Sequence, residues 1–256
     1  MKAIAIACAF SCLLAPASST VHAAPPQKNA PSIVLVHGAL IDGSAWRGVY
    51  DVLTHDGYHV SIVQQPLTGL DADVAATKRV LDQQPGPVIL VGHSYGGAII
   101  TVAGIDPKVK ALVYVAALQP DVGESVGQVA PADPQQAQDF YVTPDGFGTL
   151  KPEKFAADFG ADLPRALADF MAHAQVPVAL HVFDTQVSVA AWHDKPSYFV
   201  LATEDRALAP AVAERMAQRA GSKITRVKAS HAVLISQPRA VARVIETAAR
   251  AVAGHR

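Results

Sequence analysis

The sequence predicts an α/β protein with a mostly parallel sheet that is flanked by helices on both faces and carries an inserted helical lid. Short apolar runs alternate with amphipathic runs, and the apolar runs are nearly continuous in Val, Ile and Leu. Strands that alternate with helices form right-handed βαβ units, and strands buried on both faces need such continuous apolar sequence. A break in this alternation over residues 119–195 predicts the lid.

The first half of the alternating pattern predicts four strands and three helices. Apolar runs predict the strands, and apolar positions at helical spacing predict the helices. Gly57 follows the first helix as a typical C-terminal signal. In chain order we expect a strand at 33–36, a helix at 45–55, a strand at 58–63, a helix at 71–83, a strand at 88–91, a helix at 97–103 and a strand at 109–115.

The region 119–195 holds several prolines and many small residues but no long β run, so we expect helices and loops. Six of the eight phenylalanines lie in it. For most of them we favour packing in the lid's own core over contact with a ligand. The two flanking parts, 32–118 and 196–256, form the predicted core domain. In the second part we expect a strand at 198–201, a helix at 210–220, a strand at 224–227 and a helix at 239–252.

The N-terminus predicts export to the periplasm or the medium. Lys2 precedes an apolar stretch at 3–14 that is too short to span a bilayer. Val21-His22-Ala23 then offers small residues at the usual cleavage spacing. We therefore expect a signal peptide at 1–23 and an extended leader at 24–31. The formal net charge of −1 and the scattered basic residues do not indicate binding to nucleic acid or to an anionic membrane.

Gly92-His93-Ser94-Tyr95-Gly96 is the most informative motif of the chain. It reads G-x-S-x-G, follows an expected strand and precedes an expected helix, which is the context of a nucleophile elbow. Glycines are needed in so tight a corner because a Cβ would collide with a neighbouring element. The alternative is a glycine-rich turn with a surface serine, but the flanking pattern favours Ser94 as a nucleophile.

A serine nucleophile needs a base to take its proton and a third group to orient that base. In a parallel sheet such groups gather at the carboxyl ends of the strands. His231 follows the last expected strand and is the predicted base. Asp205 follows the preceding strand and is the predicted orienting acid. Glu204, its neighbour, and Asp121, after the strand at 109–115, are the alternatives.

Two backbone N–H groups are predicted to bind the oxyanion that forms on an attacked carbonyl. Tyr95 directly follows the nucleophile, and Ala39 lies in the loop after the first strand, which Gly38 allows to approach the site. His37 and His93 also lie at strand ends. We expect His37 to shape its loop and His93 to pack beside the elbow.

Four lid aromatics are candidate substrate contacts: Phe140, Tyr141, Phe170 and Trp192. The sequence contains no H-E-x-x-H motif and no paired cysteine ligands for a metal. Its glycine-rich βα turn also lacks the G-x-G-x-x-G spacing of a dinucleotide site. We therefore expect neither a metal nor a dinucleotide cofactor.

These motifs resemble those of the α/β-hydrolase superfamily, whose chain order of serine, acid and histidine is also found here. The segment from His37 to Trp46 is similar to that of small esterase-like enzymes: bacterial carboxylesterases, pyrethroid-hydrolase-like esterases, plant methyl-ester hydrolases and hydroxynitrile lyases. The resemblance runs from about residue 31 to the C-terminus. It implies the α/β-hydrolase fold, a modest helical lid and no cofactor. The loop lacks the glycine-rich triplet of many lipases, which argues against a long-chain lipase.

The predicted function is hydrolysis of small or medium carboxylic esters through an acyl-enzyme intermediate. One alternative is a C–C lyase or perhydrolase of the same fold. The resemblance implies that a lyase uses a lid lysine, and neither Lys151, Lys154 nor Lys195 is marked out by its setting. Another alternative is a ligand-binding protein without catalysis, although binding alone does not require all three groups of a triad. The sequence does not separate esters from thioesters, lactones or amides.

Overall fold

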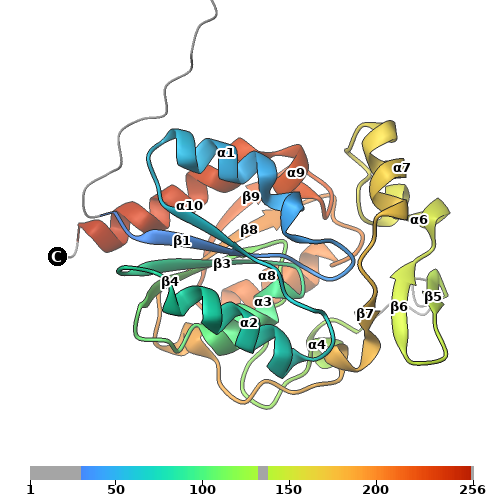
Figure 1. The fold of residues 1–256 in the computed structure, drawn as a ribbon, viewed down its shortest axis with the longest axis horizontal. Helices are drawn as coiled ribbons and strands as arrows, with labels where there is room; N and C mark the ends of the chain where they lie inside the picture. Colours follow the sequence, from blue (N-terminus) through green and yellow to red (C-terminus); the bar gives the residue numbers. More distant parts are fainter. Residues whose placement is uncertain (1–29, 132–137, 255–256) are drawn as a thin grey trace, which may run out of the picture.

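The computed structural model describes residues 30–131 and 138–254, and it contains the predicted parallel sheet (Figure 1). The predicted signal peptide and all but the last two residues of the predicted leader lie outside the described residues. Six strands hydrogen-bond in the order β2-β1-β3-β4-β8-β9, and every neighbouring pair is parallel. The strands are β1 (Ser32–Val36), β2 (Val60–Val63), β3 (Val88–His93), β4 (Val109–Val115), β8 (Ser197–Ala202) and β9 (Lys223–Val227).

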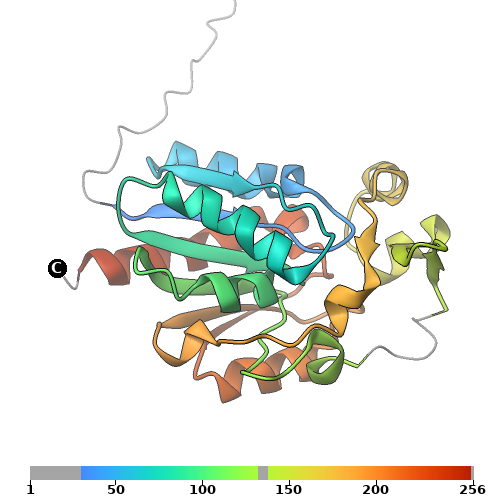
Figure 2. The same cartoon turned by 60° about the horizontal axis from the view of Figure 1, so that its bottom comes forward.

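Helices cover both faces of the sheet (Figures 1 and 2). Along β1, Ile33 and Leu35 pack into one buried cluster, and Val34 and Val36 pack into another. This alternation buries both faces of the strand, which explains its uninterrupted apolar sequence. One face carries α1 (Arg47–His55), α9 (Val233–Ser236) and α10 (Pro238–Ala253), and the other carries α2 (Leu70–Asp82), α3 (Gly96–Ala103) and α8 (Pro210–Arg219).

The insertion between β4 and β8 contains more β structure than the sequence predicts. Three short strands form an antiparallel sheet in the order β5-β6-β7. The expectation of helices and loops alone is therefore wrong. Strands of two to four residues are too short to show a recognisable alternation. The described residues of the insertion, which leave out 132–137, form α4 (Val126–Val129), β5 (Phe140–Val142), β6 (Phe147–Leu150), α6 (Pro152–Asp158), α7 (Arg165–His173), β7 (Val178–Ala179) and two 3-10 helices (Leu180–Phe183 and Ala191–His193).

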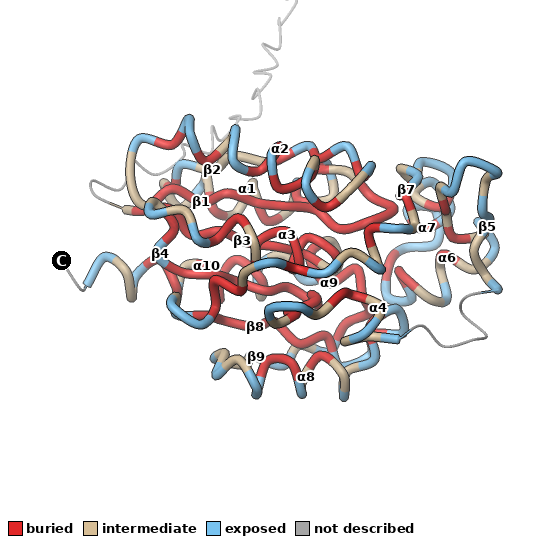
Figure 3. The backbone as a smooth tube through the Cα atoms, turned by 90° about the horizontal axis from the view of Figure 1, so that it is seen from below, coloured by how far each residue is buried: buried red, intermediate tan, exposed pale blue. Residues whose placement is uncertain are grey.

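The part of the insertion from β5 to β7 lies beyond the carboxyl ends of the sheet strands, at the right of Figures 1 and 2, and the segment after β7 runs back to the start of β8. Phe155 and Phe159 are buried and stack on each other with ring centroids 4.8 Å apart, whereas Phe170 is 69% exposed. The ring of Phe159 also packs against His93, so its contacts are not confined to the insertion. Burial is densest in the central strands, and the edge strand β9 is largely exposed (Figure 3). Within the described residues, no helix is long and apolar enough to cross a membrane.

Candidate active site

Ser94 lies in the turn between β3 and α3, next to the end of β1. In the sheet, β2 lies on one side of β1 and β3 on the other, so the strand order reverses between β1 and β3. Binding sites of open parallel sheets form at the carboxyl ends of the strands at such a switch point. Ser94 has a φ of +52°, a left-handed conformation that non-glycine residues rarely adopt. Its carbonyl accepts hydrogen bonds from the N–H groups of Gly97 (2.9 Å) and Leu118 (3.0 Å). The surrounding backbone therefore holds the serine in this conformation.

Glycines allow backbone to touch backbone around Ser94. A Cβ on Gly92 would lie 2.5 Å from the Gly96 carbonyl oxygen, and one on Gly97 would lie 2.1 Å from the Leu118 carbonyl oxygen. A Cβ on Gly38 would lie 2.8 Å from Ser94 Cβ. The loop after β1 can approach the serine this closely only because residue 38 has no side chain.

His231 and Asp205 extend a hydrogen-bonded chain from Ser94. His231 Nε2 lies 2.8 Å from Ser94 Oγ, and His231 Nδ1 lies 2.7 Å from Asp205 Oδ2. The side chains of His231 and Asp205 are only 3% and 2% exposed. Because an ionised carboxylate only accepts hydrogen bonds, these contacts assign the proton of neutral His231 to Nδ1 and leave Nε2 to accept from the Ser94 hydroxyl.

The second oxygen of Asp205 is also occupied. Asp205 Oδ1 accepts from the backbone N–H groups of Ala207 (2.9 Å) and Leu208 (2.8 Å). The two alternative acids bind other partners: Glu204 pairs with Lys228 at 3.6 Å, and Asp121 pairs with His193 at 2.7 Å. Of the three carboxylates considered, the geometry thus brings Asp205 to His231.

Three hydrogen bonds fix the conformation of the loop after β1. His37 Nδ1 lies 2.8 Å from the Gly38 carbonyl oxygen and donates to it, and burial lowers the pKa of His37, which favours its neutral form. Gln65 Nε2 donates to the His37 carbonyl. Leu40, at a φ of +68°, accepts at its carbonyl from the N–H of Val176 in the insertion (3.1 Å). These contacts agree with the expected loop-shaping role of His37.

Ala39 directly follows Gly38, and Tyr95 directly follows Ser94. Each predicted N–H donor is therefore the next residue after one of the two that meet where the loop after β1 approaches the elbow, Gly38 and Ser94. Gln65 and Val176 were not singled out in the sequence. Gln65 lies 28 residues from His37, whose carbonyl it binds. Val176 lies 136 residues from Leu40, whose carbonyl it binds.

His93 is completely buried and joins the elbow to the loop that carries His231. Its Nε2–H donates to the backbone carbonyl of His231 at 3.0 Å, and the two ring centroids lie 4.8 Å apart. Burial, together with the nearby His231, holds the pKa of His93 well below its usual value. His93 is thus a neutral donor that packs beside the elbow, as expected. Its bond to the His231 backbone goes beyond that expectation.

The insertion holds the His231 loop from the other side. The ring of Phe159 meets the His231 ring edge to face, with centroids 4.9 Å apart, and the Phe159 carbonyl accepts from the N–H of Ala232 (3.1 Å). The Ser230 hydroxyl donates to the carboxylate of Asp162. Partial burial opposes ionisation of Asp162, but the hydrogen bonds that it accepts, from Ser230 and Ser236 among others, together outweigh this effect and lower the pKa of the carboxyl. The residues on both sides of His231 are therefore bound to the insertion.

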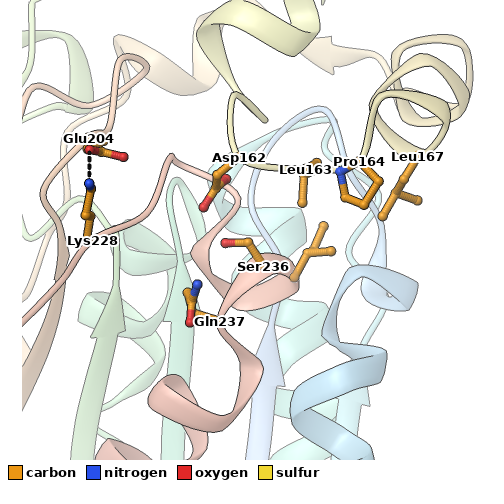
Figure 4. A pocket seen from close by; sticks show the side chains of 9 residues that line it. Asp162, Leu163, Pro164, Leu167, Glu204, Lys228, Ser236 and Gln237 are labelled. Carbon is orange, nitrogen blue, oxygen red and sulfur yellow. Dashed lines mark ion pairs between the residues drawn. The ribbon is translucent and has the colours of Figure 1, made fainter.

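Two cavities lie along the seam between α7 and the core. One of about 520 Å³ opens beside Asp162 and Ser236, with the Glu204–Lys228 ion pair at its far side (Figure 4). The other, of about 320 Å³, lies between α7 and the loop after β1, and its lining includes Leu40 and Phe170. Neither lining includes Ser94, His231 or Asp205, so these cavities flank the loops around the candidate site and do not open on the triad itself.

The four candidate lid contacts occupy different environments. Phe170 lines the smaller cavity. Phe140 and Tyr141 lie on β5, the first half-buried against the core cluster and the second exposed. Trp192 is buried, donates from Nε1 to the Pro120 carbonyl (2.9 Å) and stacks on the ring of His193. Its contacts tie Trp192 to the segment after β4 rather than to Ser94 or His231.

Comparison with known proteins agrees with this architecture. The alpha/beta hydrolase nvfD of Aspergillus novofumigatus (strain IBT 16806) is 28% identical over 242 residues, which cover 86% of this chain and 96% of the relative. The carbendazim hydrolyzing esterase of Nocardioides sp. (strain SG-4G) is 32% identical over 114 residues, or 39% of this chain and 47% of the relative.

Solved structures share the fold. The structure of a pyrethroid hydrolase from Sphingobium faniae JZ-2 aligns with a TM-score of 0.73 at 24% identity, covering 88% of this chain and 99% of that one. Polyneuridine aldehyde esterase aligns with a TM-score of 0.73 at 19% identity, covering 86% and 99%. The sequence also matches the alpha/beta hydrolase family over residues 33–244. With this match spanning most of its length, the chain belongs to the alpha/beta hydrolase family.

Proposed function

We propose that this protein is a serine hydrolase that cleaves small or medium carboxylic esters through an acyl-enzyme intermediate. The supporting observation is the continuous chain Asp205–His231–Ser94, with contacts of 2.7 and 2.8 Å. In this chain a neutral His231 carries its proton on Nδ1 and offers Nε2 to the serine. The printed names of relatives add support, since they include an esterase and Methylesterase 2 of Arabidopsis thaliana, which is 26% identical over 163 residues.

Acylation follows from the proton positions. Ser94 Oγ attacks the ester carbonyl as His231 Nε2 takes the hydroxyl proton. Asp205 stabilises the imidazolium that forms, and the N–H groups of Ala39 and Tyr95 bind the oxyanion. The C–O bond to the alcohol then breaks, and His231 returns its proton to the leaving alcohol oxygen.

Deacylation repeats these steps with water. His231 Nε2 takes a proton from water, whose oxygen attacks the acyl carbon, and the Ser94–acyl bond breaks with return of the proton to Ser94 Oγ. The products are the carboxylic acid and the free serine.

Ser94→Ala tests this function directly. The substitution removes the nucleophile, and loss of a triad serine typically lowers kcat by about 10⁶-fold. We expect turnover of a short-chain chromogenic ester to fall to the background rate. Ser197→Ala is the control: Ser197 is a buried serine whose hydroxyl bonds to that of Ser222. It is the first residue of β8, at the opposite end of the parallel sheet from Ser94, which follows β3. Undiminished turnover by Ser94→Ala refutes the proposal.

The contacts of Lys151 and Lys154, two of the three lysines considered for a lyase, do not support the lyase alternative. Lys151 Nζ donates to the Gln138 carbonyl at 2.8 Å, and Lys154 pairs with Asp139 at 3.1 Å. Both ammonium groups thus bind partners next to β5, whereas a lyase of this fold would need one over the leaving group.

A further inference from the structure

Asp73 is a fully buried carboxylate that takes no part in the proton relay. It lies in the first turn of α2, and burial raises its pKa although two hydrogen bonds oppose this effect. Placing a carboxylate in the interior costs free energy unless its partners compensate. The partners of Asp73 therefore indicate what the residue does.

Those partners come from the elbow and from the turn before α2. Asp73 Oδ2 accepts from the hydroxyl of Tyr95 at 2.9 Å, and Asp73 Oδ1 accepts from the N–H of Leu67 at 2.8 Å. Leu67 has a φ of +57°, and its carbonyl accepts from the N–H of Ala179 in β7 at 2.9 Å. One carboxylate thus connects the residue after Ser94 with a strained turn that also binds the insertion.

Tyr95 is held at both ends of its side chain. It occupies the N-cap position directly before α3, and its ring is fully buried, with the centroid of the Phe183 ring 6.1 Å away. The phenol oxygen is fixed by Asp73. Because the ring is rigid, fixing the oxygen also restricts rotation of the backbone at Tyr95, including the Ser94–Tyr95 peptide that carries the predicted oxyanion donor.

We propose that Asp73 and the Tyr95 hydroxyl are positioning groups that aim the Tyr95 N–H at the oxyanion. The proposal rests on the esterase function proposed above. Oxyanion donors accelerate the reaction only when they are aligned before the charge develops, and loss of one donor costs about 10²–10³ in kcat. Releasing the tether misaligns the donor without removing it, so we expect a smaller loss of about tenfold in kcat.

Tyr114 provides a matched control for Tyr95→Phe. It is likewise fully buried, and its hydroxyl bonds to Thr101 Oγ1 on α3 at 2.9 Å. Tyr114→Phe therefore removes a comparable buried hydroxyl contact beneath the same helix. Tyr114 lies on β4 and is not adjacent in sequence to Ser94 or to the loop after β1.

The experiment compares wild type, Tyr95→Phe, Asp73→Asn, the double variant and Tyr114→Phe on a short-chain chromogenic ester, with active sites counted by a fluorophosphonate. We expect kcat about tenfold lower for Tyr95→Phe, with KM changed less than twofold. A boronic acid, which forms a tetrahedral adduct on the serine, should bind this variant more weakly by the same factor. Asp73→Asn should lose less, because its amide N–H can still donate to the Tyr95 oxygen while its Oδ1 keeps the N–H of Leu67. The double variant should resemble Tyr95→Phe, because without the hydroxyl at position 95 residue 73 has nothing on that ring to bind. Tyr114→Phe should keep kcat within twofold.

A Tyr95→Phe kcat within twofold of wild type overturns this inference, as does an equal loss in Tyr114→Phe. Tyr95→Phe keeps the test decisive if Asp73→Asn folds poorly. If Ser94→Ala is inactive while Tyr95→Phe is normal, only the positioning role fails. If Ser94→Ala retains turnover, the proposed esterase function fails first.

Discussion

Replacing Asp205 with asparagine should invert the tautomer of His231. The amide must still offer an oxygen to the N–H groups of Ala207 and Leu208, which lie 2.9 and 2.8 Å from Oδ1. Its NH₂ group then faces His231 Nδ1 in place of the present Oδ2, which lies 2.7 Å away. Nδ1 must accept from that amide, so the imidazole proton moves to Nε2.

With its proton on Nε2, His231 cannot take the proton of Ser94. Loss of the correct tautomer in a serine triad lowers kcat by about 10⁴-fold, which corresponds to about 5.5 kcal/mol of transition-state stabilisation. Because the substitution is isosteric and leaves two backbone N–H groups satisfied, we expect the melting temperature to change little.

The assay is kcat/KM on a short-chain chromogenic ester together with the rate of fluorophosphonate labelling of Ser94. Glu204→Gln is the control, since it neutralises the adjacent acid, which pairs with Lys228 rather than with His231. An Asp205→Asn activity within tenfold of wild type refutes the reasoning. An equally large loss in Glu204→Gln shows that the wrong acid has been assigned.

Two further predictions concern stability. Gly97→Ala places a Cβ 2.1 Å from the Leu118 carbonyl oxygen and should destabilise the fold by about 3 kcal/mol or more, measured by urea unfolding. The control Gly86→Ala, with no atom within 4 Å of the added Cβ, should leave the stability unchanged. Equal urea midpoints for the two variants would contradict the reasoning. The pKa of Asp162 is lowered in the folded state, so its carboxylate stabilises the fold above its unfolded pKa, and this contribution is lost as pH falls through the folded pKa. Asp162→Asn should therefore lower Tm at pH 7, and the difference in Tm between wild type and variant should shrink below about pH 4. A difference in Tm that does not change with pH would exclude this linkage.

Local patterns in the sequence were sufficient for the core elements. The strand at 109–115 was predicted with the bounds that the structure has, and the other predicted elements of the core differ from the observed ones by no more than two residues at either end. These predictions succeed because burial on both faces demands apolar runs that are visible without knowledge of their neighbours. The helix α9 was missed, since its four residues are too few for a periodic signal.

The insertion was predicted less well because its structure depends on distant contacts. The residues of β6 pair with β5, nearby in sequence, but also with β7, about 30 residues later. Phe159 was recognised only as one of six lid phenylalanines, and Asp162 was not recognised at all. No local pattern shows that these two residues bind the residues flanking His231, some 70 positions along the chain.

The sequence by itself determined the succession of the core strands and helices along the chain, the tight turn at Ser94 and the strand ends that supply an acid and a histidine. Each of these features follows from short-range rules of burial, glycine sterics and parallel-sheet geometry. Only the tertiary structure decided that Asp205 rather than Glu204 meets His231, that the insertion braces the His231 loop, and that buried Asp73 holds Tyr95. Those outcomes depend on the direction in which individual side chains point across the fold, and packing between distant segments sets that direction.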